Sequence, residues 1–322
     1  MATIKDVAKK ANVSVATVSR VINNKGYVND ETRALVETAI KELNYIPNEL
    51  ARSLYNKHSR LIGVLVPHFD TQFYAELIEG IENQAMRLGY KIMLSNTQDN
   101  KQREADYIQI FSQYNIDGII LASNAHNITK LMNSTMPILT VDHILAENIP
   151  SITSNNVLGG VIAAQKLISG GARYILELRG PSFLLTVSER SLGFRQVLVQ
   201  NNIPYLSHDG DMINPDVSEI ERIIKDNPQI DAIFAQSDFL AIHTLYILQK
   251  LGKRVPEDIQ IIGFDNIVFT KLVSPNITTI EQPIRRMGEL AVESLVKLLN
   301  NENLGEFHRV LDVKLVERQS TK

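Results

Sequence analysis

The apolar residues of the first 46 positions recur at the spacing of short helices. Thr3 and Ser14 each precede such a stretch, and their hydroxyl groups can cap the free amides of a first helical turn, Thr3 together with Asp6. The pattern therefore predicts two short helices separated by a tight turn at Asn12-Val13. Their shared apolar side comprises Val7, Ala8, Ala11, Val13, Val18, Val21 and Ile22. A third helix follows Asn29 and ends near Asn44-Tyr45, with an apolar stripe of Leu35, Val36, Ala39, Ile40 and Leu43.

From Leu61 onward, short apolar runs alternate with amphipathic stretches. The runs predict strands buried on both faces, at 61–66, 91–95, 118–122, 138–141, 174–178, 232–235 and 259–263. The stretches between them predict helices at 74–88, 103–114, 158–168, 189–200, 218–226 and 240–251. Regular alternation of this kind is typical of doubly wound parallel sheets. Because the strands are too many for one small sheet and the pattern restarts near Asn155, we expect two α/β halves with a cleft between them.

Composition and charge agree with a small head on a larger core. The chain has 322 residues, 44% hydrophobic and 21% charged, which suffices for one small and two medium globular units. Residues 1–60 hold ten Lys or Arg and six Asp or Glu, a net charge of +4. The remaining 23 basic and 30 acidic residues give the body a net charge of −7, so that attraction to phosphate is confined to the head.

Several classes of protein are excluded or disfavoured by what the sequence lacks. With no cysteine, the chain has no disulfide framework, thiolate metal site or cysteine nucleophile. The start has no apolar signal core and no run of about 18 apolar residues exists, so we expect a cytoplasmic protein. Without H-E-x-x-H, P-loop, G-x-S-x-G or G-x-G-x-x-G motifs, we expect no enzyme, no metal and no cofactor.

The face of the second helix that is not apolar has the chemistry of a DNA-reading surface. Its side chains are small, hydroxyl-bearing or fork-shaped, which suits a major groove and its phosphates: Val15, Ala16, Thr17, Ser19, Arg20 and Asn23. The same pattern is compatible with an ordinary capped helical hairpin. The segment from Pro47 to Leu54 begins like a helix but is too short to be stable alone in water, so we expect it to order in contact with a partner.

Together these segments resemble the lactose/galactose repressor family. The matching stretches are T-I-K-D-V-A from Thr3, S-V-A-T-V-S-R-V-I-N from Ser14, Y-I-P-N from Tyr45 and A-R-S-L from Ala51. The resemblance implies an N-terminal all-α helix-turn-helix domain at 1–46 and a hinge helix and linker at 47–60. It further implies an effector-binding core at 61–322 of two doubly wound parallel-sheet subdomains similar to periplasmic sugar-binding proteins. We place one subdomain at about 61–155 and 284–310 and the other at about 156–283 and 311–322.

For the head, the resemblance implies roles residue by residue. Val15, Ala16 and Arg20 match base-reading positions, and Thr17, Ser19 and Asn23 match contacts to phosphates and nearby bases, beside Thr3, Ser14 and Asn48. Ala51 and Leu54 match a minor-groove hinge, in which Leu54 wedges between base pairs at the centre of a palindrome. Arg20 suits guanine, whereas Val15 and Ala16 suit thymine methyl groups. A homodimer on a palindromic operator with a central C-G step follows by resemblance.

Polar and aromatic residues after the strands of the core indicate a ligand site, since ligands of open α/β sheets bind beyond the carboxyl ends of strands. Carboxylates and arginine hydrogen-bond adjacent hydroxyls and aromatic rings cover apolar sugar faces, so the set is typical of a polyol site. The candidates are Phe69, Phe73, Ser123, Asp142, His143, Arg190, Ser237, Asp238, Asp265 and Gln282. Taken singly, an Asp after a strand is often a helix cap and a Phe is often core.

The resemblance assigns Asp142, Arg190, Asp238, Asp265 and Gln282 to an effector site in place. The chain departs from the family's pattern around that site. Asp70-Thr71-Gln72 replaces the Asn-Pro that often precedes the aromatic pair, His143 stands where Arg is frequent, and Ser237 stands where Asn is common. Gly171-Ala172-Arg173 also lacks the usual Gly-His. F-Y-A-E-L-I-E from Phe73 looks like pentose or sucrose regulators, so ribose and sucrose are the favoured effectors.

The expected function is repression of a sugar-catabolic operon, with release from the operator when a small sugar closes the cleft. Whether the effector is a free sugar or a sugar phosphate, and an inducer or a co-repressor, stays open. Because no leucine heptad follows Val316, we expect a dimer and not a tetramer. One alternative is a global catabolite regulator of the same family activated by a phosphorylated carrier protein. A more distant one is a sugar-binding transport component, which would need an export signal and no basic head.

Overall fold

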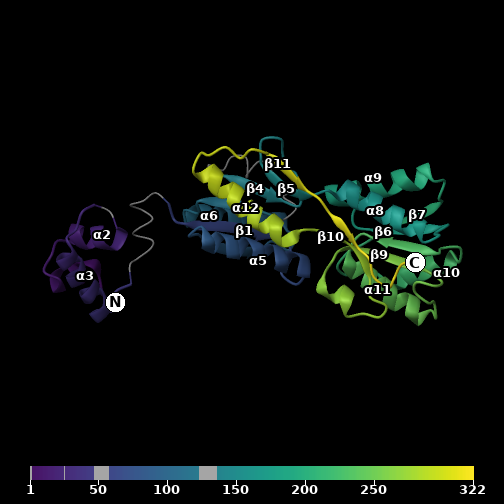
Figure 1. Cartoon of the computed structure of the whole chain (residues 1–322), viewed down its shortest axis with the longest axis horizontal. Helices are drawn as coiled ribbons and strands as arrows, with labels where there is room; N and C mark the ends of the chain where they lie inside the picture. Colours follow the sequence, from purple (N-terminus) through teal and green to yellow (C-terminus); the bar gives the residue numbers. More distant parts are fainter. Residues whose placement is uncertain (1, 25, 47–57, 123–135) are drawn as a thin grey trace. The chain divides into compact units, whose positions relative to one another are not determined.

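The computed structural model describes residues 2–24, 26–46, 58–122 and 136–322. It divides into two compact units, Met1–Ser59 and Arg60–Lys322, which we call the head and the core (Figure 1). The predicted fold class is confirmed: a short helical N-terminal region precedes a core with two largely parallel α/β sheets.

The head contains three helices, α1 (Ile4–Lys10), α2 (Val15–Asn23) and α3 (Asp30–Glu42). Their starts are encoded locally, as predicted: Thr3 and Asp6 form a reciprocal capping box, and Ser14 and Asn29 accept hydrogen bonds from the amides three residues on. The tight turn between α1 and α2 contains Asn12 in the left-handed region, at φ 53°.

Apolar side chains from all three helices close a small core in the head. Its buried members are Val7, Ala8, Ala11, Val18, Val21, Val36 and Ala39. One member of the predicted α3 stripe was wrong, because Leu35 is 53% exposed. Residues 36, 39, 40 and 43 face the other two helices, and position 35 lies one residue outside that stripe.

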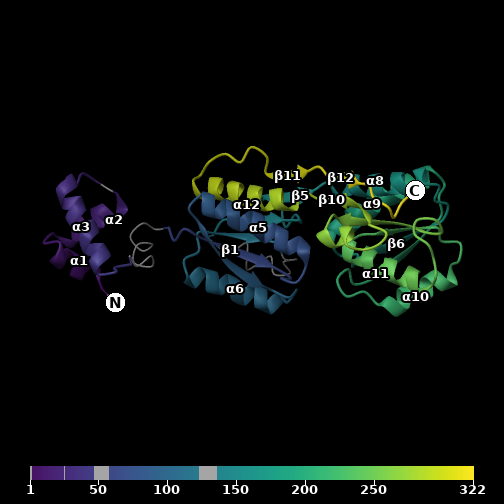
Figure 2. The same ribbon diagram turned by 60° about the horizontal axis from the view of Figure 1, so that its bottom comes forward.

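The first lobe of the core is a parallel sheet with the strand order β11-β5-β4-β3-β1-β2. Its strands are β1 (Leu61–Val66), β2 (Lys91–Asn96), β3 (Gly118–Leu121), β4 (Ile138–Val141), β5 (Ser151–Ser154) and β11 (His308–Leu311). Helices α5 (Gln72–Arg87) and α12 (Ile284–Leu299) cover one face of the sheet, and α6 (Lys101–Gln113) covers the other (Figure 2). Apolar layers on both faces bury the central strands.

The second lobe repeats this strand order as β12-β10-β9-β8-β6-β7. Its strands are β6 (Ile175–Arg179), β7 (Tyr205–Asp209), β8 (Ala232–Ala235), β9 (Gln260–Asp265), β10 (Thr278–Glu281) and β12 (Lys314–Val316). Helices α8 (Asn156–Ser169) and α9 (Leu185–Gln200) pack on one face, and α10 (Val217–Asp226) and α11 (Asp238–Lys250) on the other, with a short 3-10 turn, η1 (Val268–Lys271), after β9. Only β12 pairs antiparallel in the described sheets.

The chain passes between the lobes after β5, after β10 and after β11, so neither lobe is a continuous segment. α8 and α9 approach closely because Gly160 and Gly193 each lie where a Cβ atom would overlap the backbone of the other helix. This close packing brings Arg190 of α9 beside Asn156, the first residue of α8.

Every strand and helix expected from the core's pattern is present, with bounds shifted by a few residues. The expectation that all these strands are buried on both faces was wrong for β2, where only Ser95 is buried, because β2 lies at the sheet edge. The pattern did not predict β5, β7, β10, β11, β12 or α12. Most of these strands have polar or partly exposed residues, so they lack the apolar run that marks a central strand.

Candidate functional site

The second helix of the head presents the predicted reading residues at its surface. Val15 is 41% exposed, Ala16 and Arg20 are also exposed, and Thr17, Ser19 and Asn23 are half-buried. Ser14 accepts a hydrogen bond from the Thr17 amide at 3.1 Å, so it fixes the start of the helix that carries these side chains. Thr3 has the same capping role on α1. The predicted hinge contacts Asn48, Ala51 and Leu54 lie outside the described residues.

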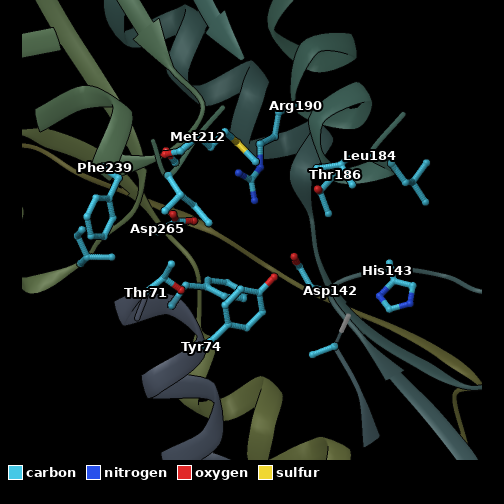
Figure 3. A pocket seen from close by; sticks show the side chains of 16 residues that line it. Thr71, Tyr74, Asp142, His143, Leu184, Thr186, Arg190, Met212, Phe239 and Asp265 are labelled. Atoms are coloured by element: carbon cyan, nitrogen blue, oxygen red, sulfur yellow. The ribbon is translucent and has the colours of Figure 1, made fainter. Parts of the chain in front are cut away.

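A cavity between the two lobes of the core encloses about 850 Å³, part of which is open to solvent. Both lobes contribute to its walls through residues that follow strand ends. In Figure 3, Arg190 and Asp265 of the second lobe point into the cavity toward Asp142 and Tyr74 of the first lobe. The remaining lining residues are Thr71, Phe73, Ala122, His143, Leu184, Leu185, Thr186, Met212, Ile213, Ser237, Phe239 and Ile267.

The structure brings six of the predicted effector residues together in this cavity: Phe73, Asp142, His143, Arg190, Ser237 and Asp265. Ser123 lies outside the described residues. Phe69 does not line the cavity and is 46% exposed, two residues before the wall begins at Thr71.

Asp238 and Gln282 also lie behind the cavity wall. Asp238 is fully buried, and its two carboxylate oxygens accept hydrogen bonds from the Ile267 amide at 2.8 Å and the Thr279 hydroxyl at 2.6 Å. Gln282 donates through Nε2 to Oδ1 of Asp265 at 2.6 Å. Both residues therefore support the loop that carries Asp265, and neither is part of the surface that a ligand would touch.

The lining residues that were not assigned to the site are mostly apolar. Leu184, Leu185 and Thr186 follow β6, Met212 and Ile213 follow β7, and Phe239 and Ile267 follow β8 and β9. Their place after strand ends is the same signal that identified Asp142 and Asp265. Polar and aromatic residues at those positions signal a polyol site, whereas aliphatic side chains there are indistinguishable in the sequence from ordinary core residues.

Two hydrogen bonds hold the Arg190 side chain in place, one to the start of α8 and one to the backbone after β8. Its Nε donates to Oδ1 of Asn156 at 2.9 Å, and one terminal nitrogen donates to the Gln236 carbonyl at 2.6 Å. The guanidinium lies 3.8 Å from the ring centre of Phe264, a cation–π contact. These contacts orient a 5% exposed cation toward the cavity without a carboxylate bonded to it.

Burial dominates the electrostatics of the two carboxylates that line the cavity. Burial raises the pKa of Asp142 to about 7, although Arg190 opposes this, and Asp265 raises it further. Burial likewise raises the pKa of Asp265 to about 6, against the effects of Arg190 and the Gln282 hydrogen bond. Small changes of pH near neutrality therefore change the protonation of these two carboxyl groups. A ligand that donates hydrogen bonds to them favours their ionised forms.

The described residues contain no group of three or more His, Asp or Glu side chains arranged to hold a metal ion. Across the same described ranges, no helix combines the length and the apolar character that crossing a membrane requires.

Comparison with known proteins relates both units to one family. Residues 3–48 match the family described as bacterial regulatory proteins, lacI family, and residues 164–321 match a periplasmic binding protein-like domain. The ribose operon repressor of Halalkalibacterium halodurans is 37% identical over 100% of this chain and 98% of its own length. The sucrose operon repressor of Streptococcus mutans is 37% identical over 99% of each chain.

Among solved structures, a lac repressor dimer bound to operator and the anti-inducer ONPF has a TM-score of 0.90 at 26% identity and covers 99% of each chain. The likeness thus extends from the first helix of the head to the end of the core. Sequence identity of 37% over nearly the whole chain establishes that these proteins are related. The capped reading helix and the two-lobed core with its enclosed cavity are those of a transcriptional regulator, and this chain belongs to the lacI family of bacterial regulatory proteins.

Proposed function

We propose that this protein represses a sugar-catabolic operon by binding a palindromic operator as a homodimer, and that a small sugar releases it. The observation that carries the proposal is the pairing of two sites in one chain. One is an exposed reading face on α2, and the other is a cavity whose walls combine Asp142, Asp265 and Arg190. A DNA-reading surface and a polyol site joined in one chain are the parts of a ligand-controlled repressor.

In this assignment, residues 1–46 read DNA, 47–60 form the hinge, and 61–322 bind the effector. The first subdomain comprises about 61–155 and 284–310, and the second comprises about 156–283 and 311–322. Arg20 reads guanine, Val15 and Ala16 contact thymine methyl groups, and Leu54 of each subunit wedges at the centre of the operator. A function on DNA places the protein in the cytoplasm.

The ligand closes the cavity by contacting both lobes, because its walls come from both. A change in the lobes alters the spacing of the two hinge segments in a dimer, so operator and sugar oppose each other's binding. Linkage requires that this opposition be equal in both directions, with a coupling free energy of about 1 to 3 kcal/mol in typical cases. The protein is thus a regulator without an enzymatic step, as its repressor relatives are.

The effector is a small sugar, with ribose and sucrose as the first choices. The relatives named as ribose and sucrose operon repressors support both. Carboxylates and an arginine around a cavity with aromatic Phe73 match the mix of hydroxyl groups and apolar faces on such molecules.

Fluorescence anisotropy of the full chain on a labelled palindromic operator from its own promoter region tests this proposal. D-ribose, sucrose, their phosphate esters and a purine base are titrated separately. Release by one sugar, with a scrambled operator as control, supports the local repressor. Binding that no sugar affects, but that a phosphorylated carrier protein tightens, contradicts it in favour of the global regulator.

A further inference from the structure

One wall of the cavity holds buried polar atoms without a hydrogen-bond partner among the described residues. In the described part of the chain, Thr71 Oγ1, Asp142 Oδ1 and His143 Nε2 lack a partner, and all three residues line the cavity wall of the first lobe. Buried polar atoms are normally hydrogen-bonded, because leaving one unpaired costs its lost hydration. A bound molecule that pairs with these three atoms would remove that cost, so their chemistry indicates which groups the ligand carries.

The hydrogen bonds of His143 determine which kind of group its free nitrogen needs. Its Nδ1 lies 3.0 Å from the carbonyl oxygen of Val141, and a carbonyl only accepts, so Nδ1 carries the hydrogen. Burial lowers the pKa of His143, which keeps the ring neutral. In a neutral ring with hydrogen on Nδ1, Nε2 has a lone pair. His143 therefore faces the ligand as a hydrogen-bond acceptor.

Asp142 needs the same kind of partner. In its ionised form the carboxylate only accepts hydrogen bonds, and Oδ1 has no donor among the described residues. Thr71 adds a hydroxyl that can accept as well. The first lobe thus favours a ligand with hydrogen-bond donors at neighbouring positions. The hydroxyl groups of a polyol are such donors, whereas the oxygens of a phosphate dianion only accept hydrogen bonds.

Charge in the cavity points the same way. Among the described lining residues, Arg190 is the one permanent cation, and Nε and one terminal nitrogen are already bonded to Asn156 and Gln236. The acidic residues of the lining are Asp142 and Asp265, and Glu189 is close enough to raise the pKa of Asp142. A phosphate group would add up to two negative charges beside these carboxylates.

We propose that His143 Nε2 accepts a hydrogen bond from an effector hydroxyl beside the one that Asp142 accepts, and that the negative charge of Asp142, Asp265 and Glu189 makes the site select an unphosphorylated sugar over its phosphate ester. The inference rests on the proposed function only in assuming that the effector occupies this cavity. It identifies His143 as a specificity-determining residue and assigns the chemical class of the ligand.

Titration calorimetry of the full chain without DNA tests the proposal. The probes are D-ribose with ribose 5-phosphate, and sucrose with sucrose 6-phosphate. We expect wild-type protein to bind one free sugar at least tenfold more tightly than its phosphate ester. Equal or tighter binding of the ester overturns the proposal.

Deoxy analogues of the sugar that binds then separate recognition from structure. For D-ribose these are the 2-deoxy, 3-deoxy and 5-deoxy sugars. His143→Phe should weaken the parent sugar about tenfold, the scale of one lost hydrogen bond, and leave the one analogue that lacks the contacted hydroxyl unchanged. His143→Gln, whose amide oxygen restores an acceptor, should recover most of the affinity. His243→Phe on α11, outside the cavity lining, is the matched control and should change nothing.

A uniform loss for all analogues in His143→Phe would assign the residue a structural role and refute the proposal. If no sugar binds while operator binding is intact, the inference fails and the repressor function stands. If the sugar selectivity appears but no operator is bound, the proposed function fails and the inference stands.

Discussion

The head and the core of this protein treat their functional polar groups in opposite ways. On α2 of the head, Arg20 is exposed to water and Val15 is 41% exposed, so the reading face is hydrated until DNA displaces that water. In the core, Arg190 is 5% exposed, and Asp142 and His143 each have a buried atom that has no partner within the described ranges. In the proposed function, the surface site reads a large, charged partner, and the enclosed site reads a small molecule group by group.

This difference indicates that a substitution can abolish binding at one site without affecting binding at the other. The reading face rests on three capped helices and a small apolar core, all within the head. The cavity is lined by residues of the core alone. Substitutions in one site should therefore leave binding at the other site intact.

Arg20→Ala should have the largest effect. Losing a base contact worth about 1 to 3 kcal/mol in each half-site lowers operator affinity about thirtyfold or more, because a dimer uses the contact twice. Sugar affinity, measured by calorimetry, should stay the same. Lys41→Ala on α3 removes the same charge from the head and is the control. Equal losses in both variants would show that Arg20 contributes only general charge.

Arg190→Ala should abolish the response to sugar and keep operator binding. The loss of a charge-assisted contact, together with the disturbed bonds to Asn156 and Gln236, lowers sugar affinity by about 30-fold or more. Anisotropy with and without sugar measures both effects. Arg190→Lys keeps the charge and guards against a folding defect. A normal sugar response in Arg190→Ala would move the effector out of this cavity.

The pH dependence of sugar binding should be about tenfold between pH 6 and 8, the size set by one proton with a pKa of about 7 on Asp142. A sugar that donates hydroxyl hydrogens favours the ionised carboxylate, so affinity falls as pH falls through 7. The ligand-free fold changes in the opposite direction. Because this pKa is raised from 3.8 to about 7, ionisation costs folding free energy, and stability falls as pH rises between those two values.

Calorimetry in buffers of different ionisation enthalpy measures the released proton. Asp142→Asn removes the ionisation and should flatten both profiles. The groups that act on this titration are Arg190, Asp265 and Glu189, so a profile that persists in Asp142→Asn would assign it to Asp265, whose pKa is about 6.

Ser14→Ala should have the smallest effect, about 1 kcal/mol on the stability of the head. The Ser14 hydroxyl accepts a hydrogen bond from the Thr17 amide at 3.1 Å, and an alanine leaves that amide without its side-chain cap. Hydrogen exchange of the α2 amides in the full chain measures the change. Protection in the core strands should not respond, and an equal loss there would mean that the two units unfold together.

Much of the head and of the fold class was readable from sequence, because the information is local. Thr3, Ser14 and Asn29 cap helices within three residues of themselves, and the apolar positions repeat at helical spacing. The central strands are buried on both faces and therefore form apolar runs. Polar and edge strands such as β7 and β11 lack that signal, since neighbouring strands and not their own side chains hold them in place.

The sequence by itself determined the kinds of side chain that end the core strands, and it identified Asp142, Arg190 and Asp265 as a set. Only the tertiary structure decided how those groups are used. It placed Asp238 behind the wall with its oxygens bonded to Ile267 and Thr279, and it left His143 Nε2 in the cavity wall without a partner among the described residues. The partners of Asp238 lie 29 and 41 residues away in the chain, so their pairing depends on how the second sheet brings distant loops together. His143 bonds to nearby Val141, but only the fold brings it into the cavity wall beside residues of the other lobe.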